Sequence, residues 1–516
     1  MSAFTHYLKT TGCKQYKEAR HLAEELSQHD AETEPFKSKY KAREILVDLK
    51  KNLNKYSEEV DSEGCEGRQC LEEAQELYNK YKHEVDRAPV YIHELLEKDC
   101  EEKDDHERWQ EFEKLYTHTL YYLAQVYGGL KENHKSASYC QTTLQRQLQY
   151  DQYEPLEWAL NCATLSQYYI TESRYTQARH CLASASFIFS LHKDKGERKA
   201  DEGEEERRLE DIANREADLA RCWTKYCISL LEDSIVYSKE KLSADTSGHD
   251  KEEDKDTDEN DKHQPRFESL ELTSLEMQVT DKYVTVFEEA RDVFLAAQRW
   301  IAESKKFYQI DGFVSEYIEI IKDHSMLFKL LAFFETDSER KCKMFKRRVD
   351  MLQSVIKQLN PQHFLLLSRQ LIFECAETYS GMVDLKICIA EQSQPTTQHA
   401  VKKINLLIMH SIGQYQAFID SLRKPDGTMP NALEEDVVRP AMVAHFCMGR
   451  LYSKLISESR KKIENMNSSL NQYKAVVDYC KSHPGVVKLV EAELEICEEM
   501  VLLLPARIDQ LRTNLD

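Results

Sequence analysis

Glycine and proline are the scarce residues of this sequence, with 14 and 11 among 516 positions. Glycine is therefore about 3% of the chain, against an average usage of roughly 7%. Parallel α/β folds need glycine in tight turns and phosphate-binding loops, so the composition disfavours a Rossmann or P-loop enzyme. Few prolines, together with many Leu, Glu, Lys, Gln and Ala, favour helix. The composition predicts an all-α protein.

Long apolar runs are also missing. No uninterrupted stretch approaches the length that spans a membrane, and the N-terminal segment MSAFTHYLKTTGCKQYKEAR lacks the apolar core of a secretory signal. The 15 cysteines are odd in number and scattered over helical stretches, which indicates reduced thiols. We therefore expect a cytoplasmic chain with no membrane insertion.

Positive charge is in deficit, with 70 Lys and Arg against 91 Asp and Glu and a formal net charge of −21. A chain this acidic repels the phosphates of nucleic acids, so we expect a basic protein surface as its partner. The run from Arg340 to Arg348 is the one positive stretch. On a helix it spreads over more than one face, so we expect it to be solvated or paired with acidic neighbours.

Catalytic and metal-binding motifs are absent as well. The sequence has no glycine-rich phosphate loop, no Gly-x-Ser-x-Gly elbow and no His-Glu-x2-His pair. Asp254, Asp256 and Asp258 imitate the first ligands of an EF-hand loop. However, Glu259 and Pro265 stand where that loop needs glycine and glutamate. We expect no enzymatic activity, no cofactor and no metal.

Helical periodicity covers most of the chain and is broken by one acidic segment. Residues 245–262 hold nine Asp or Glu and three Lys, with almost nothing apolar. Such a segment cannot bury enough surface to offset the entropy lost on ordering. We therefore predict an N-terminal helical half over 1–237, an acidic disordered linker over 238–268 and a C-terminal helical half over 269–516.

One stretch has the spacing of a tetratricopeptide unit. It contains the positions Leu165, Ser166, Tyr169, Tyr175, Ala178, Leu182 and Ala185. The pattern bulky-small-x2-Tyr lets two helices approach closely, and it occurs earlier at Leu123-Ala124-x2-Tyr127. Weaker occurrences of the pattern, the two later echoes, begin at Cys375 and Met448. A chance match explains these two as well as a repeat does. Because the spacing is not the regular interval of about 34 residues, we expect an α-solenoid of degenerate tetratricopeptide-like antiparallel helix pairs in two halves.

Residues interleaved with these packing positions are candidates for a binding groove. The first helix of each tetratricopeptide pair lines the concave face, which places Tyr121, Tyr122 and Gln125 in the groove for one unit and Thr164 and Gln167 for the next. Gln147 lies at the end of the helix between them. Tyrosine provides a large contact area at low entropy cost and favours protein interfaces. The alternative is that Tyr121 and Tyr122 pack against the next helix pair.

Long fragments of the sequence resemble a known family. They are EPFKSKY, KLYTHTLYYLAQVY, TTLQRQL, EWALNCATLSQYYI, ARHCLASASFIF, ARCWTKYC, FFETDSERKCKMFKRR and EEDVVRPAM. The resemblance is to the kinesin-family-binding protein (KIF-binding protein) family and runs from about Glu34 to the C-terminus. Between Tyr56 and Arg68 the chain passes almost directly from its first helix to RQCLEEAQELYNKY, where family members carry more helices. The helix over 71–85 is therefore expected without its usual partner.

The resemblance implies a tetratricopeptide-like solenoid that binds kinesin motor domains and blocks their attachment to microtubules. A cytoskeletal location and roles in axonal, organelle and mitochondrion transport, neurogenesis and differentiation come with it. The family's motor-contacting residues fall on Tyr122, Gln125, Gln147 and Thr164. The motor's microtubule-binding face is basic because tubulin is acidic, which suits an acidic competitor. We expect a monomer.

A second function class remains open at this point. Tetratricopeptide scaffolds also serve as chaperone co-factors that hold the C-termini of peptides in a clamp of Lys and Arg. Tyr121, Gln125, Thr164 and Gln167 supply no such cations. The sequence therefore favours the motor inhibitor over the chaperone co-factor.

Overall fold

The computed structural model describes residues 11, 13–26, 37–54, 67–85, 87–90, 104–194, 202–247, 266–392 and 397–513. The centre of the predicted acidic linker and the junction between Tyr56 and Gly67 lie outside these residues. The EF-hand imitation at Asp254–Asp258 lies outside them too.

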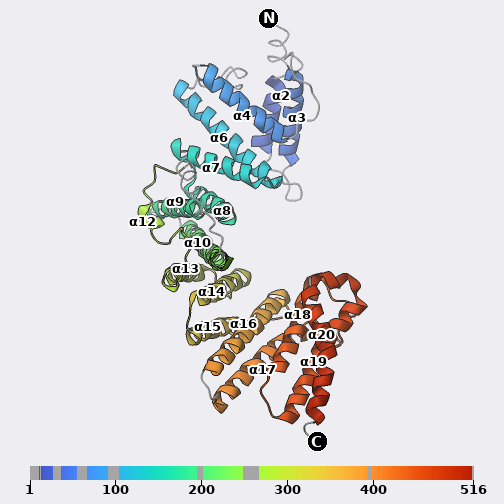
Figure 1. Ribbon diagram of the computed structural model, residues 1–516. Coiled ribbons are helices and arrows are strands. Elements are labelled where there is room, and N and C mark those ends of the chain that lie inside the picture. The colour runs from blue at the N-terminus through green and yellow to red at the C-terminus, as the bar shows by residue number, and fades with distance from the viewer. Residues whose placement is uncertain are drawn as a thin grey trace. The chain divides into compact units, whose positions relative to one another are not determined.

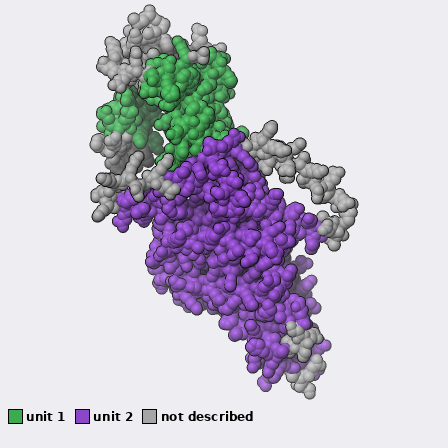
Figure 2. Space-filling model, turned by 90° about the vertical axis from the view of Figure 1, so that its left-hand side faces the viewer, with its two compact units in different colours: residues 1–168 green, residues 169–516 purple. Residues whose placement is uncertain are grey.

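The chain divides into two compact units, residues 1–168 and 169–516 (Figures 1 and 2). Unit 1 contains α2 (Cys13–Glu24), α3 (Lys37–Asn54), α4 (Gly67–Glu84), α6 (Asp105–Gly129) and α7 (Asn133–Gln149), and α8 (Pro155–Thr171) crosses the boundary. Unit 2 contains α9 (Tyr175–Asp194), α10 (Glu202–Ser247), α12 (Thr273–Glu276), α13 (Phe287–Phe307), α14 (Val314–Phe334), α15 (Ser338–Ile356), α16 (Leu365–Gln392), α17 (Gln398–Asp420), α18 (Glu435–Lys454), α19 (Ser459–Ser482), the 3-10 helix η4 (Pro484–Leu489) and α20 (Glu491–Thr513).

Each helix packs mainly against its neighbours in the sequence. In unit 1, α2 packs on α3, α4 on α6 and α6 on α7; in unit 2, α9 packs on α10, α10 on α13, and each of α13 to α19 on the helix that follows it. The described residues contain no strand. This arrangement confirms the predicted all-α solenoid of helix pairs. Helix α4, expected without its usual partner, packs on α6.

The predicted packing positions are buried. Leu165, Ser166, Tyr169, Tyr175, Ala178, Leu182 and Ala185 all lie in the interior, as do Leu123, Ala124 and Tyr127. The two later echoes are packing sites as well, because Cys375, Ala376 and Tyr379 are buried, together with Met448 and Gly449.

The small residue of the pattern makes a recurring contact with the next helix. The hydroxyl of Ser136 on α7 donates a hydrogen bond to the carbonyl oxygen of Ala124 on α6, at 2.8 Å. Ser411 on α17 does the same to Ala376 on α16 at 2.8 Å, and Ser469 on α19 to Gly449 on α18 at 2.7 Å. A hydroxyl reaches a helical carbonyl only when the two backbones lie close, which a larger side chain at the small position would prevent.

The predicted division into 1–237, 238–268 and 269–516 is not tested by these contacts and stays a prediction. Helix α10 continues to Ser247, beyond the predicted end of the first half. Its middle packs on α13 and α14 within unit 2.

We predict that Gly449→Ala lowers the urea midpoint of unfolding. A β-carbon at this position would lie 2.8 Å from Cε1 and 2.9 Å from Cζ of Tyr473, whose ring is held in the interior of unit 2. Overpacking of this kind costs about 1–3 kcal/mol, more than the helix propensity gained by alanine.

Gly413→Ala is the matched control. Gly413 is an exposed position inside α17, and a β-carbon there has no neighbour within 4 Å. Alanine should stabilise this helix by up to about 1 kcal/mol. Urea unfolding of both variants is monitored by the helical circular dichroism signal. Equal unfolding midpoints for the two variants would contradict the close approach of α18 and α19.

Candidate functional site

Helix α6 carries three of the predicted binding residues, and a capping box fixes where it begins. The backbone N–H of Glu107 donates to Oδ1 of Asp104 at 2.8 Å, and the N–H of Asp104 donates to Oε2 of Glu107 at 3.3 Å. These reciprocal bonds satisfy two donors that a helix start otherwise leaves free. The start of α6 therefore sets which of its residues face inward.

Opposite faces of α6 have opposite roles. The inward face consists of Glu113, Thr117, Leu120, Leu123, Ala124 and Tyr127, which recur every three or four residues and are buried. Tyr121, Tyr122 and Gln125 lie on the other side and are exposed, Tyr122 to 57%. The rings of Tyr121 and Tyr122 meet edge to face, with centroids 5.5 Å apart. Both side chains are thus accessible in the structure, while the assignment of these residues to a binding groove stays a prediction.

Sequence reasoning missed two members of this surface. Leu115 is exposed to 53%, and His118 is exposed one turn before Tyr122. The spacing 115, 118, 122 is that of one helical face, so the same periodicity that located the tyrosines was the signal for them. We call Leu115, His118, Tyr121, Tyr122 and Gln125 the α6 face.

The other predicted residues lie on the neighbouring helices of unit 1. Thr164 on α8 is exposed, and its hydroxyl donates to the carbonyl oxygen of Leu160 at 2.9 Å. Gln167 is half-buried and donates its amide to Oγ of Ser166 at 3.2 Å. Gln147 lies in the last turn of α7, and its buried Oε1 accepts no hydrogen bond from any described residue. Neither Gln147 nor Thr164 is hydrogen-bonded to the described residues of the α6 face.

A buried carboxylate lies beneath the α6 face and joins three helices. Glu113 on α6 is only 3% exposed. It accepts hydrogen bonds from Tyr78 at 2.6 Å and from Lys82, both on α4, and from Arg146 on α7. A buried charge is tolerated only when paired and hydrogen-bonded, so these contacts fix the positions of α4 and α7 on α6.

The pKa shifts of this cluster follow from its contacts. Burial alone would raise the pKa of Glu113, but the hydrogen bonds from Lys82, Tyr78 and Arg146 outweigh it and the pKa is lowered. Burial, followed by the hydrogen bond to Glu113, raises the pKa of Tyr78. At neutral pH the cluster therefore holds an ionised carboxylate and a neutral phenol.

Aromatic rings extend the same junction. Tyr78 of α4 and Tyr116 of α6 stack with their centroids 3.5 Å apart, and the guanidinium of Arg146 lies 4.6 Å from the Tyr116 ring. Further along, Tyr127 donates to Glu72, and this bond raises the pKa of Tyr127 to about 12. The α6 face is thus presented by a helix that its neighbours hold from behind.

The described residues around this surface show no metal-binding cluster. Within the described part of the chain, no three His, Cys, Asp or Glu side chains gather so as to hold a metal ion. Among the same residues, no helix combines the length and apolarity needed to cross a bilayer. What the described geometry offers is a surface for contact.

Comparison with known proteins identifies close relatives. A family model described as "KIF-1 binding protein C terminal" matches residues 156–511. The KIF-binding protein of Gallus gallus is 41% identical over 581 aligned positions that cover 98% of both chains. Those of Xenopus tropicalis and Danio rerio are 48% and 45% identical, over 80% and 83% of this chain and 69% and 70% of their own. The chicken alignment is longer than the 516 residues here, so it includes positions that this chain lacks.

We predict that Glu113→Gln destabilises the protein by about 2 kcal/mol at pH 7, because Lys82 and Arg146 lose their shared counter-charge. A carboxyl whose folded pKa is lowered contributes stability above its unfolded pKa and loses it as the pH falls through the folded value. The difference between wild type and variant should therefore shrink as the pH is lowered below about 4.5.

Glu76→Gln is the control, because Glu76 is an exposed carboxylate on α4 with no hydrogen bond or ion pair to a described residue. Urea unfolding followed by circular dichroism at several pH values measures both variants. A pH-independent gap between wild type and Glu113→Gln would refute the ionised state of Glu113.

Proposed function

Because this chain belongs to the KIF-binding protein family, we propose that it binds kinesin motor domains and blocks their attachment to microtubules. The observation that carries the proposal is the family match over more than two thirds of the chain. The names of these relatives refer only to KIF binding. The block of microtubule attachment is our addition, and it rests on the chemistry of the surface.

The α6 face has the chemistry of a binding surface. Tyr121 and Tyr122 present large rings with polar tips, and aromatic residues of this kind dominate the energy of protein interfaces. The Glu113 cluster holds α6 from behind, so the helix that carries the rings needs little reordering when a partner docks. We propose that the α6 face contacts the motor domain.

Polar residues of unit 1 complement the tyrosines. Gln125 and Thr164 are exposed, and Gln147 has a buried carbonyl oxygen that accepts no hydrogen bond from a described residue. We propose Gln125, Gln147, Thr164 and Gln167 as the polar contacts of the same interface.

Electrostatics favour the encounter. The chain carries a formal net charge of −21, and a motor face that binds acidic tubulin is basic. Opposite charge raises the association rate and directs the basic face towards this chain. Inhibition then needs no chemistry, since a motor face that is occupied cannot also touch the filament. Effects on axonal and organelle transport, at a cytoskeletal location, would follow.

A microtubule co-pelleting assay tests the proposal directly. The family model's description names KIF-1, so the motor domain of a KIF-1 kinesin is the first probe. With a non-hydrolysable nucleotide the motor alone should sediment with microtubules, and the full chain in excess should keep it in the supernatant. A motor that binds the chain in a pull-down yet still sediments at saturating chain would refute the block of attachment.

The location of the interface has its own test. We predict that Tyr122→Ala combined with Gln125→Ala weakens motor binding about tenfold or more, because an interface centre loses an aromatic anchor. Both side chains are exposed, so circular dichroism should stay native. Tyr40→Ala is the control, since Tyr40 is 62% exposed on α3. Equal affinity of the double variant and the control would place the interface elsewhere.

A further inference from the structure

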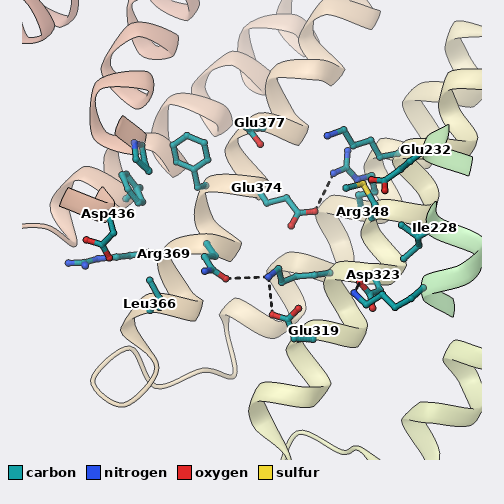
Figure 3. A pocket seen from close by; sticks show the side chains of 18 of the residues that line it. Ile228, Glu232, Glu319, Asp323, Arg348, Leu366, Arg369, Glu374, Glu377 and Asp436 are labelled. Carbon is teal, nitrogen blue, oxygen red and sulfur yellow. Dashed lines mark hydrogen bonds and ion pairs between the residues drawn. The ribbon is translucent and has the colours of Figure 1, made fainter. Parts of the chain in front are cut away.

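Unit 2 contains a cleft that the proposed motor interface does not use. Its cavity of about 940 Å³ is lined by residues of α10, α14, α15, α16, α17 and α18 (Figure 3). Apolar side chains supply part of the lining, including Met326, Leu366 and Phe373. Leu366 is 57% exposed, so apolar surface remains open to a ligand. Clefts of this size and mixed lining are typical of binding sites.

Most of the charges in the cleft cancel in pairs. Lys225 contacts Asp323 at 2.6 Å, joining α10 to α14. Within α14, Lys322 contacts Glu319 at 2.9 Å, and Arg348 of α15 contacts Glu374 of α16 at 3.2 Å (Figure 3). Ser325 donates to the same carboxylate of Glu374, at 2.5 Å. Each of these cations already has an internal counter-charge.

Arg369 is also committed within the fold. Its Nη2 donates to the carbonyl oxygen of Ser421 at 2.7 Å, and its Nε donates to the Ser421 hydroxyl at 3.1 Å. These bonds tie α16 to the end of α17. Four of the five cationic side chains that line the cleft therefore already form ion pairs or hydrogen bonds within the fold.

Three carboxylates of the lining, Glu232, Glu377 and Asp436, are left without such a partner in the described part of the chain. Glu232 on α10 and Glu377 on α16 form no hydrogen bond and no ion pair with the described residues, and Figure 3 shows them on different walls of the cleft. Burial raises the pKa of both groups, and the charge of Lys329 on α14 opposes that rise for both. Neither carboxylate has an ion-pair partner of its own, and the lining, with six carboxylates and five cations, carries an excess of negative charge.

We propose that this cleft binds a basic amphipathic segment of a partner protein, with a lysine or arginine between Glu232 and Glu377 and an apolar side chain against Met326 and Phe373. An added cation would give each carboxylate a counter-charge of its own. The apolar side chain would cover surface that water now reaches. The inference does not depend on a kinesin being the partner.

An acidic ligand fits the cleft less well. To bind an anion, Lys225, Lys322 or Arg348 would have to release its own carboxylate, which would then lie unpaired in a partly buried site. Lys329 alone is open to an anion, and Glu232 and Glu377 flank its charge. The arrangement of charges therefore selects a cation.

Fluorescence anisotropy with the full chain tests the proposal. The probe is a fluorescein-labelled helical peptide of leucine and lysine at amphipathic spacing, and its counterpart has glutamate in place of every lysine. We expect the lysine peptide to bind wild type and the glutamate peptide not to bind. Glu232→Gln combined with Glu377→Gln should weaken the lysine peptide about fivefold or more, and Lys329→Glu should tighten it.

Glu495→Gln combined with Glu499→Gln is the matched control. It removes the same total charge from exposed positions of α20, outside the cleft, and should change the affinity less than twofold. Equal losses of affinity for the lysine peptide in the two double variants would overturn the proposal. The same holds if the lysine peptide shows no saturable binding to wild type. Preferred binding of the glutamate peptide, abolished by Lys329→Glu, would also overturn it.

Discussion

Close approach of consecutive helices is the constraint on which this solenoid depends. Two helices come close enough for a serine on one to reach a backbone carbonyl of the other only where the second carries a small residue. Ala124, Ala376 and Gly449 are such residues. The carbonyl exposed by that small residue receives the hydroxyl of a serine on the next helix, so the polar group that close packing would bury is satisfied at the same point. The same contact recurs in both units.

Orientation of the α6 face adds a second, non-local constraint. Glu113 lies 35 residues from Tyr78 and 33 residues from Arg146 in the sequence, yet the three meet in the interior of unit 1. Ionic contacts of this kind are directional, unlike apolar packing, and they fix the rotation of α6 about its own axis. Rotation decides whether Tyr121 and Tyr122 face the outside or a neighbouring helix. The buried carboxylate and the exposed tyrosines are therefore two consequences of one arrangement.

The sequence predicted what depends on local spacing and missed what depends on distant contacts. Helical periodicity located the buried positions around Leu123 and Leu165 and the exposure of Tyr122 and Gln125. It could not reveal that Glu113 is buried, because an isolated glutamate on a helix looks solvated until its partners on α4 and α7 are known. Arg348 shows the same limit, since it belongs to a run expected to be solvated or paired and proves buried against Glu374.

Net charge and local charge act at different ranges in this protein. The formal charge of −21 acts over a Debye length of about 10 Å or less at physiological salt, so it guides encounters but does not choose a binding site. The choice falls to carboxylates that the fold leaves without a counter-charge. Glu113 is saturated by three donors and serves the fold, whereas Glu232 and Glu377 form no ion pair with a described residue. A basic partner drawn to the acidic surface gains most where such a deficit lies beside accessible apolar side chains.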